Sequence, residues 1–535
     1  MSAPGTSQWP TSAEYAARAR RGSFVAGAVA VTAAGAYAAT LVATEGEPLI
    51  VAPLVGALVG FAVFWRPVFG LYLLFGTVLL LEQFEISGLA PLTAATHFYE
   101  NLSGFSNIPL RLSTSDLLTL MICASWAARR LVGANPPMRA GPFGWAVALY
   151  GLAFAVGGFI GAARGGGWNE IAALAEARGA VYVCLLYFLT ANLIHERRQL
   201  LVLLWEFVLI VGVKALQAVG NYAQVRQNGP YWVEAVTSHE EVVFFNVAIG
   251  LVLIMAALRL RGRLFSVLLA LQPIIIAGEL WTTRRVAFAS LAAALLMVMM
   301  MSAVDRLRAT MIAIAIGVFA FGIYAGVFWD YSGPIAGPLR VVRAAIDPNS
   351  QTARDLSSNN WRDIENSNIA YTVRQFPLTG VGLGQEYLFL REPPALTSFP
   401  YWRLMTHNAV LWLWLKAGVF GAFALWFLVA QVIIRGLKLY KRLDDPILRA
   451  AAAFPVLLMA ALIVYASVDL GLTANRTMSV LGIALGLAAP LSALAVSKRA
   501  SIRPNLSTLD EAPLPTNLPP RPRPRVGGPV PTGNS

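Results

Sequence analysis

The amino-acid sequence is dominated by long, mostly apolar runs that are separated by short polar connectors. A helical run of about 20 residues, at about 1.5 Å per residue, crosses a hydrocarbon core of about 30 Å. A helix also satisfies its own backbone hydrogen bonds in lipid, where water cannot do so. The sequence therefore predicts an all-α, polytopic membrane protein.

Composition supports this prediction and excludes an ordinary soluble protein. Apolar residues make up 57% of the 535 residues, and charged residues make up only 13%, about half of the fraction typical of soluble domains. We predict about 12–14 transmembrane helices and a large extracytoplasmic loop. The candidate spans start near Phe24, Pro48, Pro67, Leu117, Phe143, Val181, Gln199, Val242, Leu264, Val286, Thr310, Asn408, Arg449 and Thr477.

The net charge of +13 arises mostly from arginines in the connectors, so it indicates membrane topology and not nucleic-acid binding. If Arg18, Arg20 and Arg21 lie in the cytoplasm, the alternate connectors on that side hold most of the remaining basic residues. We therefore predict that both termini are cytoplasmic. Cys123 and Cys184 fall inside predicted spans and are interpreted as packing residues.

The chain is predicted to contain six segments. They are a cytoplasmic N-terminus (1–23), N-terminal transmembrane helices (24–240), a central group of transmembrane helices (241–329), a large extracytoplasmic loop (330–406), C-terminal transmembrane helices (407–499) and a cytoplasmic Pro-rich tail (500–535). The loop is too polar to enter lipid and too long for a simple connector, so we expect it to carry specificity. The tail lacks the apolar residues for a core and is predicted to be disordered.

Two arginines at the predicted outer face are candidates for binding chemistry. Arg284 and Arg285 follow Trp281 at the outer end of a predicted span, where a positive pair is disfavoured. Side chains that reach toward lipid headgroups would explain them. An anion site would also explain them, because guanidinium groups match phosphate oxygens with paired hydrogen bonds.

A histidine lies on the same predicted side. His407 immediately precedes a span, and an imidazole can accept a proton near neutral pH. A single histidine at a helix start is more often a surface or capping residue, so its position alone does not establish catalysis. The helical period returns Gly418 to nearly the same face, and Gly418 and Gly421 are predicted to let a neighbouring helix pack closely.

Three sequence blocks belong together in this region. They are Thr283-Arg284-Arg285-Val286-Ala287-Phe288, then Arg362 followed by Pro377-Leu378-Thr379-Gly380-Val381-Gly382-Leu383-Gly384, and then His407-Asn408 with nine residues before Gly418-Val419-Phe420-Gly421. In this order the blocks resemble the family of O-antigen ligases and Wzy-type O-antigen polymerases. The resemblance covers roughly residues 240 to 435, and the spacing in the third block is its specific part.

The resemblance implies a metal-independent, inverting glycosyltransferase without a cofactor. Such an enzyme takes a glycan from an undecaprenyl-pyrophosphate carrier at the outer face of the bacterial inner membrane and transfers it to an acceptor hydroxyl during surface or exopolysaccharide synthesis. His407 would be the catalytic base, and Arg284, Arg285 and Arg362 would bind the pyrophosphate. Asn408 would orient either the imidazole or the substrate.

The resemblance also implies partners. The donor is a polyprenyl-pyrophosphate-linked oligosaccharide in the bilayer, and the acceptor is a second lipid-linked repeat, a lipid A core or a protein. A chain-length regulator and a flippase are further expected partners. Polymerase and ligase differ in the acceptor and both stay open, although the span count and the long N-terminal region favour a polymerase.

Two other functions fit parts of the sequence. A metal-dependent glycosyltransferase that uses a polyprenyl-monophosphate sugar would place paired acids in the first outer loop, where Glu45-Gly46-Glu47 lies. A lipid-linked glycan transporter would use charges inside spans, such as Glu206, Lys214 and Lys416. We expect these three charges to form mutual ion pairs that line a groove for the lipid carrier.

Overall fold

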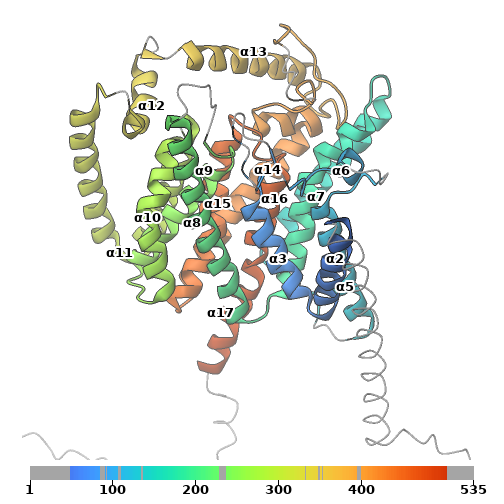
Figure 1. Cartoon of the computed structure of the whole chain (residues 1–535), viewed down its shortest axis with the longest axis horizontal. Helices are drawn as coiled ribbons and strands as arrows, with labels where there is room; N and C mark the ends of the chain where they lie inside the picture. The colour runs from blue at the N-terminus through green and yellow to red at the C-terminus, as the bar shows by residue number, and fades with distance from the viewer. Residues whose placement is uncertain are drawn as a thin grey trace, which may run out of the picture. The chain divides into compact units, whose positions relative to one another are not determined.

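The structure is a computed structural model that describes residues 48–84, 89, 91, 93–94, 96–105, 110–133, 137–227, 236–282, 284–331, 333–347, 350–351, 353–394, 399 and 401–502. Regular secondary structure in these residues is helical, and Asn101 and Ser113 form an isolated bridge. The predicted all-α membrane fold is confirmed. The chain divides into two units, Met1–Ser492 and Ala493–Ser535, and the first unit holds the helical bundle (Figure 1).

Eight helices in the described residues are long and apolar enough to cross a membrane. They are α6 (Gly144–Arg164), α7 (Glu170–Leu193), α8 (Arg197–Gln227), α10 (Arg263–Trp281), α11 (Arg285–Phe328), α14 (Ala409–Arg442), α15 (Pro446–Ala466) and the run Asn475–Ala495, which α16 (Asn475–Gly486) and α17 (Ala488–Ile502) share. Other helices are α2 (Pro48–Trp65), α3 (Pro67–Leu80), α4 (Leu102–Phe105), α5 (Thr114–Leu131) and α9 (Glu241–Ala257). Every predicted span start from Pro48 onward falls in or beside one of these helices, whereas Phe24 and Glu45-Gly46-Glu47 lie outside the described residues.

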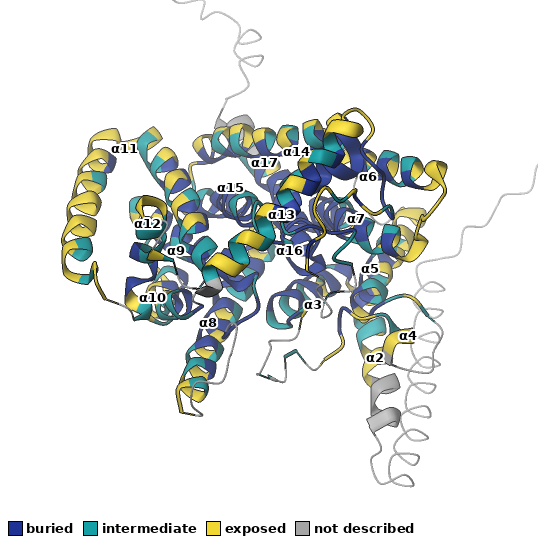
Figure 2. Cartoon of the chain, turned by 90° about the horizontal axis from the view of Figure 1, so that it is seen from above, coloured by how far each residue is buried: buried dark blue, intermediate teal, exposed yellow. Residues whose placement is uncertain are grey.

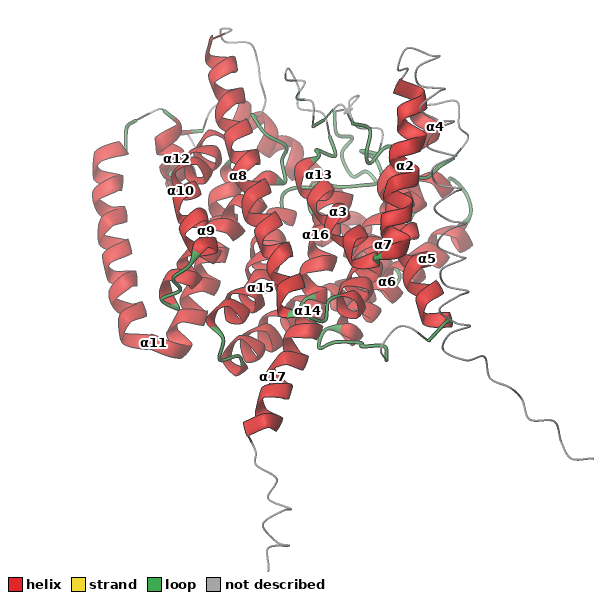
Figure 3. Ribbon diagram, turned by 60° about the horizontal axis from the view of Figure 1, so that its bottom comes forward, coloured by secondary structure: helices red, strands yellow, loops and turns green. Residues whose placement is uncertain are grey.

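Helix α11 contains two of the predicted spans. Its backbone leaves the helical region at Arg306, where φ is −147° and ψ is 62°, so two arms meet at a sharp bend (Figure 3). The second arm exposes large apolar side chains, including Ile312, Phe319 and Val327. By contrast, α15 and α16 lie in the buried centre of the bundle (Figure 2). The apolar surface of the second arm is suited to contact with lipid.

The large loop is itself partly helical. It contains a 3₁₀ turn (η1, Pro334–Ala336), α12 (Gly337–Ile346) and α13 (Ala353–Gln375). Helix α13 lies across one end of the bundle, above α16 in the view of Figure 2. This placement brings polar side chains of the loop over the helix ends that hold the candidate site residues.

After α13 the chain returns to the bundle through a glycine-rich turn (Pro377–Gly384). Gly382 has a φ of 94°, and a Cβ there would lie 2.2 Å from the backbone nitrogen of Gly161 on α6. The backbone N–H of Leu383 donates to the carbonyl of Gly157 at 2.9 Å. Backbone contact this close to α6 requires glycine.

Helix α14 is broken where it meets the glycine-rich turn. Gly418 has a φ of 62°, which interrupts the helical hydrogen bonds. The carbonyls of Leu415 and Lys416 instead accept hydrogen bonds from the backbone N–H groups of Val381 (2.8 Å) and Gly382 (3.0 Å). The turn therefore satisfies backbone groups that the break leaves free.

The sequence predicts that a neighbouring helix packs closely against Gly418 and Gly421. This prediction is wrong, because the segment that packs against Gly418 is the glycine-rich turn. A Cβ on Gly418 would lie 2.0 Å from the carbonyl oxygen of Leu378, which belongs to the glycine-rich turn. A Cβ on Gly421 would meet Ala417 of the same helix at 2.6 Å. The argument from helical period also fails, because His407 precedes the helix and the break at Gly418 ends its first segment.

We expect Gly418→Ala to destabilise the protein by about 1–3 kcal/mol, because alanine at positive φ is strained, and the clash with Leu378 adds to this cost. Gly322→Ala is the matched control, since nothing lies within 4 Å of a Cβ at that position in the second arm of α11. Thermal unfolding of the detergent-purified protein measures the difference. Equal midpoints for the two variants would contradict this account of the break.

The buried lysines Lys214 and Lys416 are paired with carboxylates, but not with Glu206 as the sequence predicts. Lys416 lies 2.8 Å from Glu176 on α7, and both side chains are fully buried. Lys214 pairs with Glu82 and with Glu241, the latter at 3.4 Å. Glu206 and Lys214 are eight residues apart on α8, which separates them by about 12 Å along the helix axis, too far for an ion pair.

Candidate active site

His407 is held by α13. The buried carboxylate of Glu365 accepts a hydrogen bond from the backbone N–H of His407 at 3.0 Å and lies 3.3 Å from the imidazole Nδ1. The Trp361 ring packs edge-on against the imidazole, with 4.8 Å between centroids. A proton on Nδ1 would be donated to Glu365, which leaves the Nε2 lone pair available as a base. The His407 side chain is 26% exposed, so it stays accessible.

Asn408 caps α14. Its Oδ1 accepts a hydrogen bond from the backbone N–H of Leu411 at 3.1 Å, and its Nδ2 donates to Asn366 on α13 at 3.2 Å. Asparagine is a favoured capping residue because its side chain satisfies a free N–H at the first turn. Glu365 lies within hydrogen-bond distance of the His407 imidazole, whereas the Asn408 side chain caps the helix that starts beside His407.

Arg284 and Arg285 lie at the start of α11 and point to different partners. Arg284 contacts the imidazole Nε2 of His239 and lies 3.9 Å from Asp469. Arg285 donates to Asn359 Oδ1 at 2.7 Å and lies 3.4 Å from Asp355, both on α13. The two arginines therefore connect α11 with the loop before α9, the connection between α15 and α16, and α13.

Arg362 on α13 lies in the same electrostatic neighbourhood. Burial lowers the pKa of the Arg362 guanidinium, and the nearby charges of Arg285 and Arg284 lower it further. The carboxylates of Asp469 and Glu365 act in the opposite direction. Arg284 and Arg285 are therefore close enough to Arg362 for their charges to affect its pKa.

Two of these guanidinium groups have unused donors. The Nε atoms of Arg284 and Arg362 are buried and have no hydrogen-bond partner among the described residues. A buried N–H without a partner costs free energy, about 1–3 kcal/mol. An anion with several oxygens would supply the missing acceptors.

Asp469 lies between His239 and Arg284. It lies between α15 and α16 with 6% of its side chain exposed, and its Oδ2 is 3.2 Å from the Nδ1 of His239. Burial alone would raise the pKa of this carboxyl, yet His239, Arg284 and His407 together hold the pKa below its usual range. Asp469 is therefore a carboxylate that balances the surrounding positive charge.

Sequence reasoning missed Glu365, His239 and Asp469. Glu365 follows Arg362 by three residues, so a predicted helix in the loop would have placed both on one face. His239 and Asp469 each lie beside a predicted outer helix end, which is a signal similar to that of His407. The sequence shows no sign that they contact each other, because 230 residues separate them.

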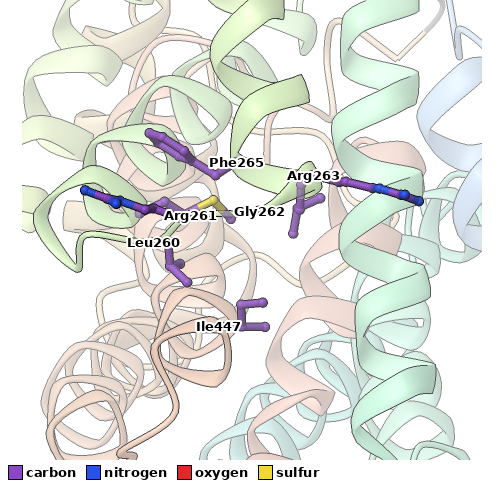
Figure 4. A pocket seen from close by; sticks show the side chains of 8 residues that line it. Leu260, Arg261, Gly262, Arg263, Phe265 and Ile447 are labelled. Carbon is purple, nitrogen blue, oxygen red and sulfur yellow. The ribbon is translucent and has the colours of Figure 1, made fainter.

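Two cavities among the described residues are lined by other side chains than this cluster. A cavity of about 50 Å³ is lined by residues around the end of α9 and the start of α10, and by Ile447 (Figure 4). A larger apolar cavity of about 660 Å³ lies between α6 and α7, with Phe154, Trp168 and Leu383 in its lining. The described residues contain no group of three or more His, Cys, Asp or Glu that could hold a metal ion.

Residues 274–427 match a family model whose description is O-antigen ligase. The matched region runs from α10 into α14 and contains Arg284, Arg285, Arg362 and His407, whereas His239 and Asp469 lie outside it. No curated protein matches the chain. The match over residues 274–427, together with the all-helical membrane fold, supports an assignment to the O-antigen ligase family.

Proposed function

We propose that this protein is a membrane glycosyltransferase of the O-antigen ligase or polymerase type. It transfers or polymerises a glycan from an undecaprenyl-pyrophosphate carrier onto an acceptor hydroxyl during surface or exopolysaccharide synthesis. The observation that carries the proposal is the cluster formed by the His407–Glu365 pair, Asp469 and the arginines at one end of the bundle. The family match supports glycan transfer in general.

In the proposed mechanism, Arg284, Arg285 and Arg362 bind the pyrophosphate. The bond between the anomeric carbon and the pyrophosphate oxygen breaks, and the lipid pyrophosphate leaves with an additional negative charge. Donors that are already oriented toward this charge stabilise it more in a site with little water than in bulk solvent. The unpaired Nε groups of Arg284 and Arg362 are suited to this role.

His407 acts as the base in this mechanism. Its Nε2 takes the proton of the acceptor hydroxyl while the acceptor oxygen forms the new glycosidic bond. Glu365 holds the imidazole and stabilises its protonated form, as the third group of a catalytic triad does. Attack opposite the leaving group inverts the anomeric centre. Asn408 orients the substrate or maintains the start of α14 beneath His407.

The site would face outward from the bacterial inner membrane, with both termini in the cytoplasm. The acceptor is a second lipid-linked repeat, a lipid A core or a protein, and a flippase and a chain-length regulator act with the enzyme. Loop helix α13 supplies Arg362 and Glu365, so the large loop contributes directly to the site in this proposal. The three arginines bind the donor, and the acceptor approaches His407.

We expect Arg362→Gln to lower the transfer rate by about 10²–10³-fold, because the variant loses charge stabilisation of the departing pyrophosphate. Arg374→Gln is the matched control, since Arg374 is exposed on the same helix. Transfer from a lipid-linked donor in proteoliposomes measures the rates. Single Lys substitutions at Arg284, Arg285 and Arg362 should also slow turnover by removing paired hydrogen bonds. Wild-type rates in all of these variants would rule out the arginine site.

A further inference from the structure

A second imidazole lies in the cluster, outside the region that matches the family. His239 precedes α9, and its side chain is 44% exposed. Its Nδ1 lies 3.2 Å from Asp469 Oδ2, and its Nε2 contacts a terminal nitrogen of Arg284. The ring therefore bridges the carboxylate and one of the proposed pyrophosphate ligands.

These two contacts fit one neutral tautomer of the ring. A guanidinium group has five N–H donors and no acceptor, so the contact with Arg284 requires a lone pair on His239 Nε2. The ring proton is then on Nδ1, where it is donated to the carboxylate of Asp469. In this arrangement the imidazole is neutral and occupies a donor of Arg284 that a phosphate oxygen could use.

The charged groups around His239 come from several elements. Arg284 at the start of α11 and Asp469 between α15 and α16 contact it directly. Arg362 on α13 and His407 before α14 reach it through Asp469.

The acids next to His239 in the chain have other partners. Glu240 accepts a hydrogen bond from Ser238 and lies 3.8 Å from Arg476, and Glu241 lies 2.6 Å from Arg476. Among the described residues, Asp469 is therefore the carboxylate that contacts His239 and would balance a positive charge on it.

We propose that His239 is a fourth cation of the pyrophosphate site, neutral when the site is empty and protonated when the donor is bound. This inference rests on the proposed function. When the donor binds, the Arg284 N–H moves from His239 Nε2 to a phosphate oxygen. Nε2 then takes one proton from solvent and donates a hydrogen bond to the pyrophosphate, while the Nδ1–H keeps its hydrogen bond to Asp469. No covalent bond changes, and the protein gains one proton per donor bound.

The sign of the pH dependence follows from this proton uptake. The bound state holds one proton more than the empty state, so donor affinity is highest at low pH and falls as the pH rises. In the interval where His239 is protonated only in the bound state, affinity falls by about tenfold per pH unit.

Calorimetry of the full-length protein in nanodiscs tests this inference. The probe is a short-chain citronellyl diphosphate sugar, whose diphosphate is a diester and exchanges no proton near neutral pH. Titration in two buffers of different ionisation enthalpy measures the number of protons taken up. At the pH where donor affinity falls most steeply, we expect the wild type to take up close to one proton. His239→Gln should lose this uptake, and His407→Gln should retain it.

His239→Lys provides a second variant, because its permanent charge should bind the probe without proton uptake. The wild-type measurement itself does not depend on the folding of any variant. Binding without proton uptake by the wild type, or uptake that survives in His239→Gln, would overturn the role of His239 and leave the proposed function standing. Failure of the wild type to bind the probe at any pH would overturn both.

Discussion

Replacement of His407 by glutamine is expected to lower glycan transfer by about 10²–10⁴-fold, because the acceptor hydroxyl loses its general base. Glutamine is similar in size to histidine and keeps hydrogen-bonding groups, but it cannot take up the proton. The backbone N–H of His407 would still donate to Glu365, so the start of α14 should keep its position. The loss should therefore appear in kcat with little change in donor affinity.

Electrophoresis of cell-surface polysaccharide, together with transfer assays on the purified protein, measures this effect. His97→Gln is the control, because His97 is an exposed histidine in another loop, paired with Glu100. A single repeat unit on the acceptor would identify a polymerase, whereas long chains that accumulate on the carrier would identify a ligase. A normal polysaccharide ladder from the His407 variant, expressed at the wild-type level, would remove this residue as the base.

Replacement of Lys416 by methionine is expected to destabilise the protein by about 3–5 kcal/mol, because it leaves the fully buried Glu176 without its cation. Glu176 also accepts a hydrogen bond from the backbone N–H of Gly384 at 2.6 Å, so the pair fastens the glycine-rich turn to α7 and α14. Loss of the pair should therefore loosen the chain between Arg362 and His407 as well as lower the stability.

Thermal unfolding in detergent measures this change. Lys438→Met is the control, because Lys438 is exposed on the same helix. The double variant Lys416→Met with Glu176→Gln removes both charges and keeps an acceptor for Gly384, so much of the lost stability should return. A midpoint for Lys416→Met equal to that of Lys438→Met would mean that the buried pair contributes nothing to the fold.

Much of the fold could be predicted from the sequence because the membrane imposes one strong constraint. An apolar run must become a helix in lipid, so the spans starting near Val286 and Thr310 were located although a bend at Arg306 joins them in one element. Partners of charges inside spans could not be predicted in this way. Lys214 and Glu206 share a helix, yet the cation pairs with Glu82 and Glu241 from other segments.

The candidate site shows the same division. Arg284, Arg285 and His407 could be selected from the sequence because they lie at predicted helix ends, and Arg362 because the three motifs resemble those of a known family. Glu365 could not be recognised as the partner of His407, since this contact requires α13 to lie across the bundle.

The sequence by itself determined the helical membrane architecture and pointed to four candidate site residues, Arg284, Arg285, Arg362 and His407. Only the tertiary structure decided that His239 shares Asp469 with the arginine cluster and that Gly418 breaks α14 to receive the glycine-rich turn. The physical reason is range. Hydropathy and helix formation depend on residues within a few helical turns of one another. Hydrogen bonds and ion pairs require atoms within about 4 Å, and residues far apart in the sequence come this close only when the chain folds.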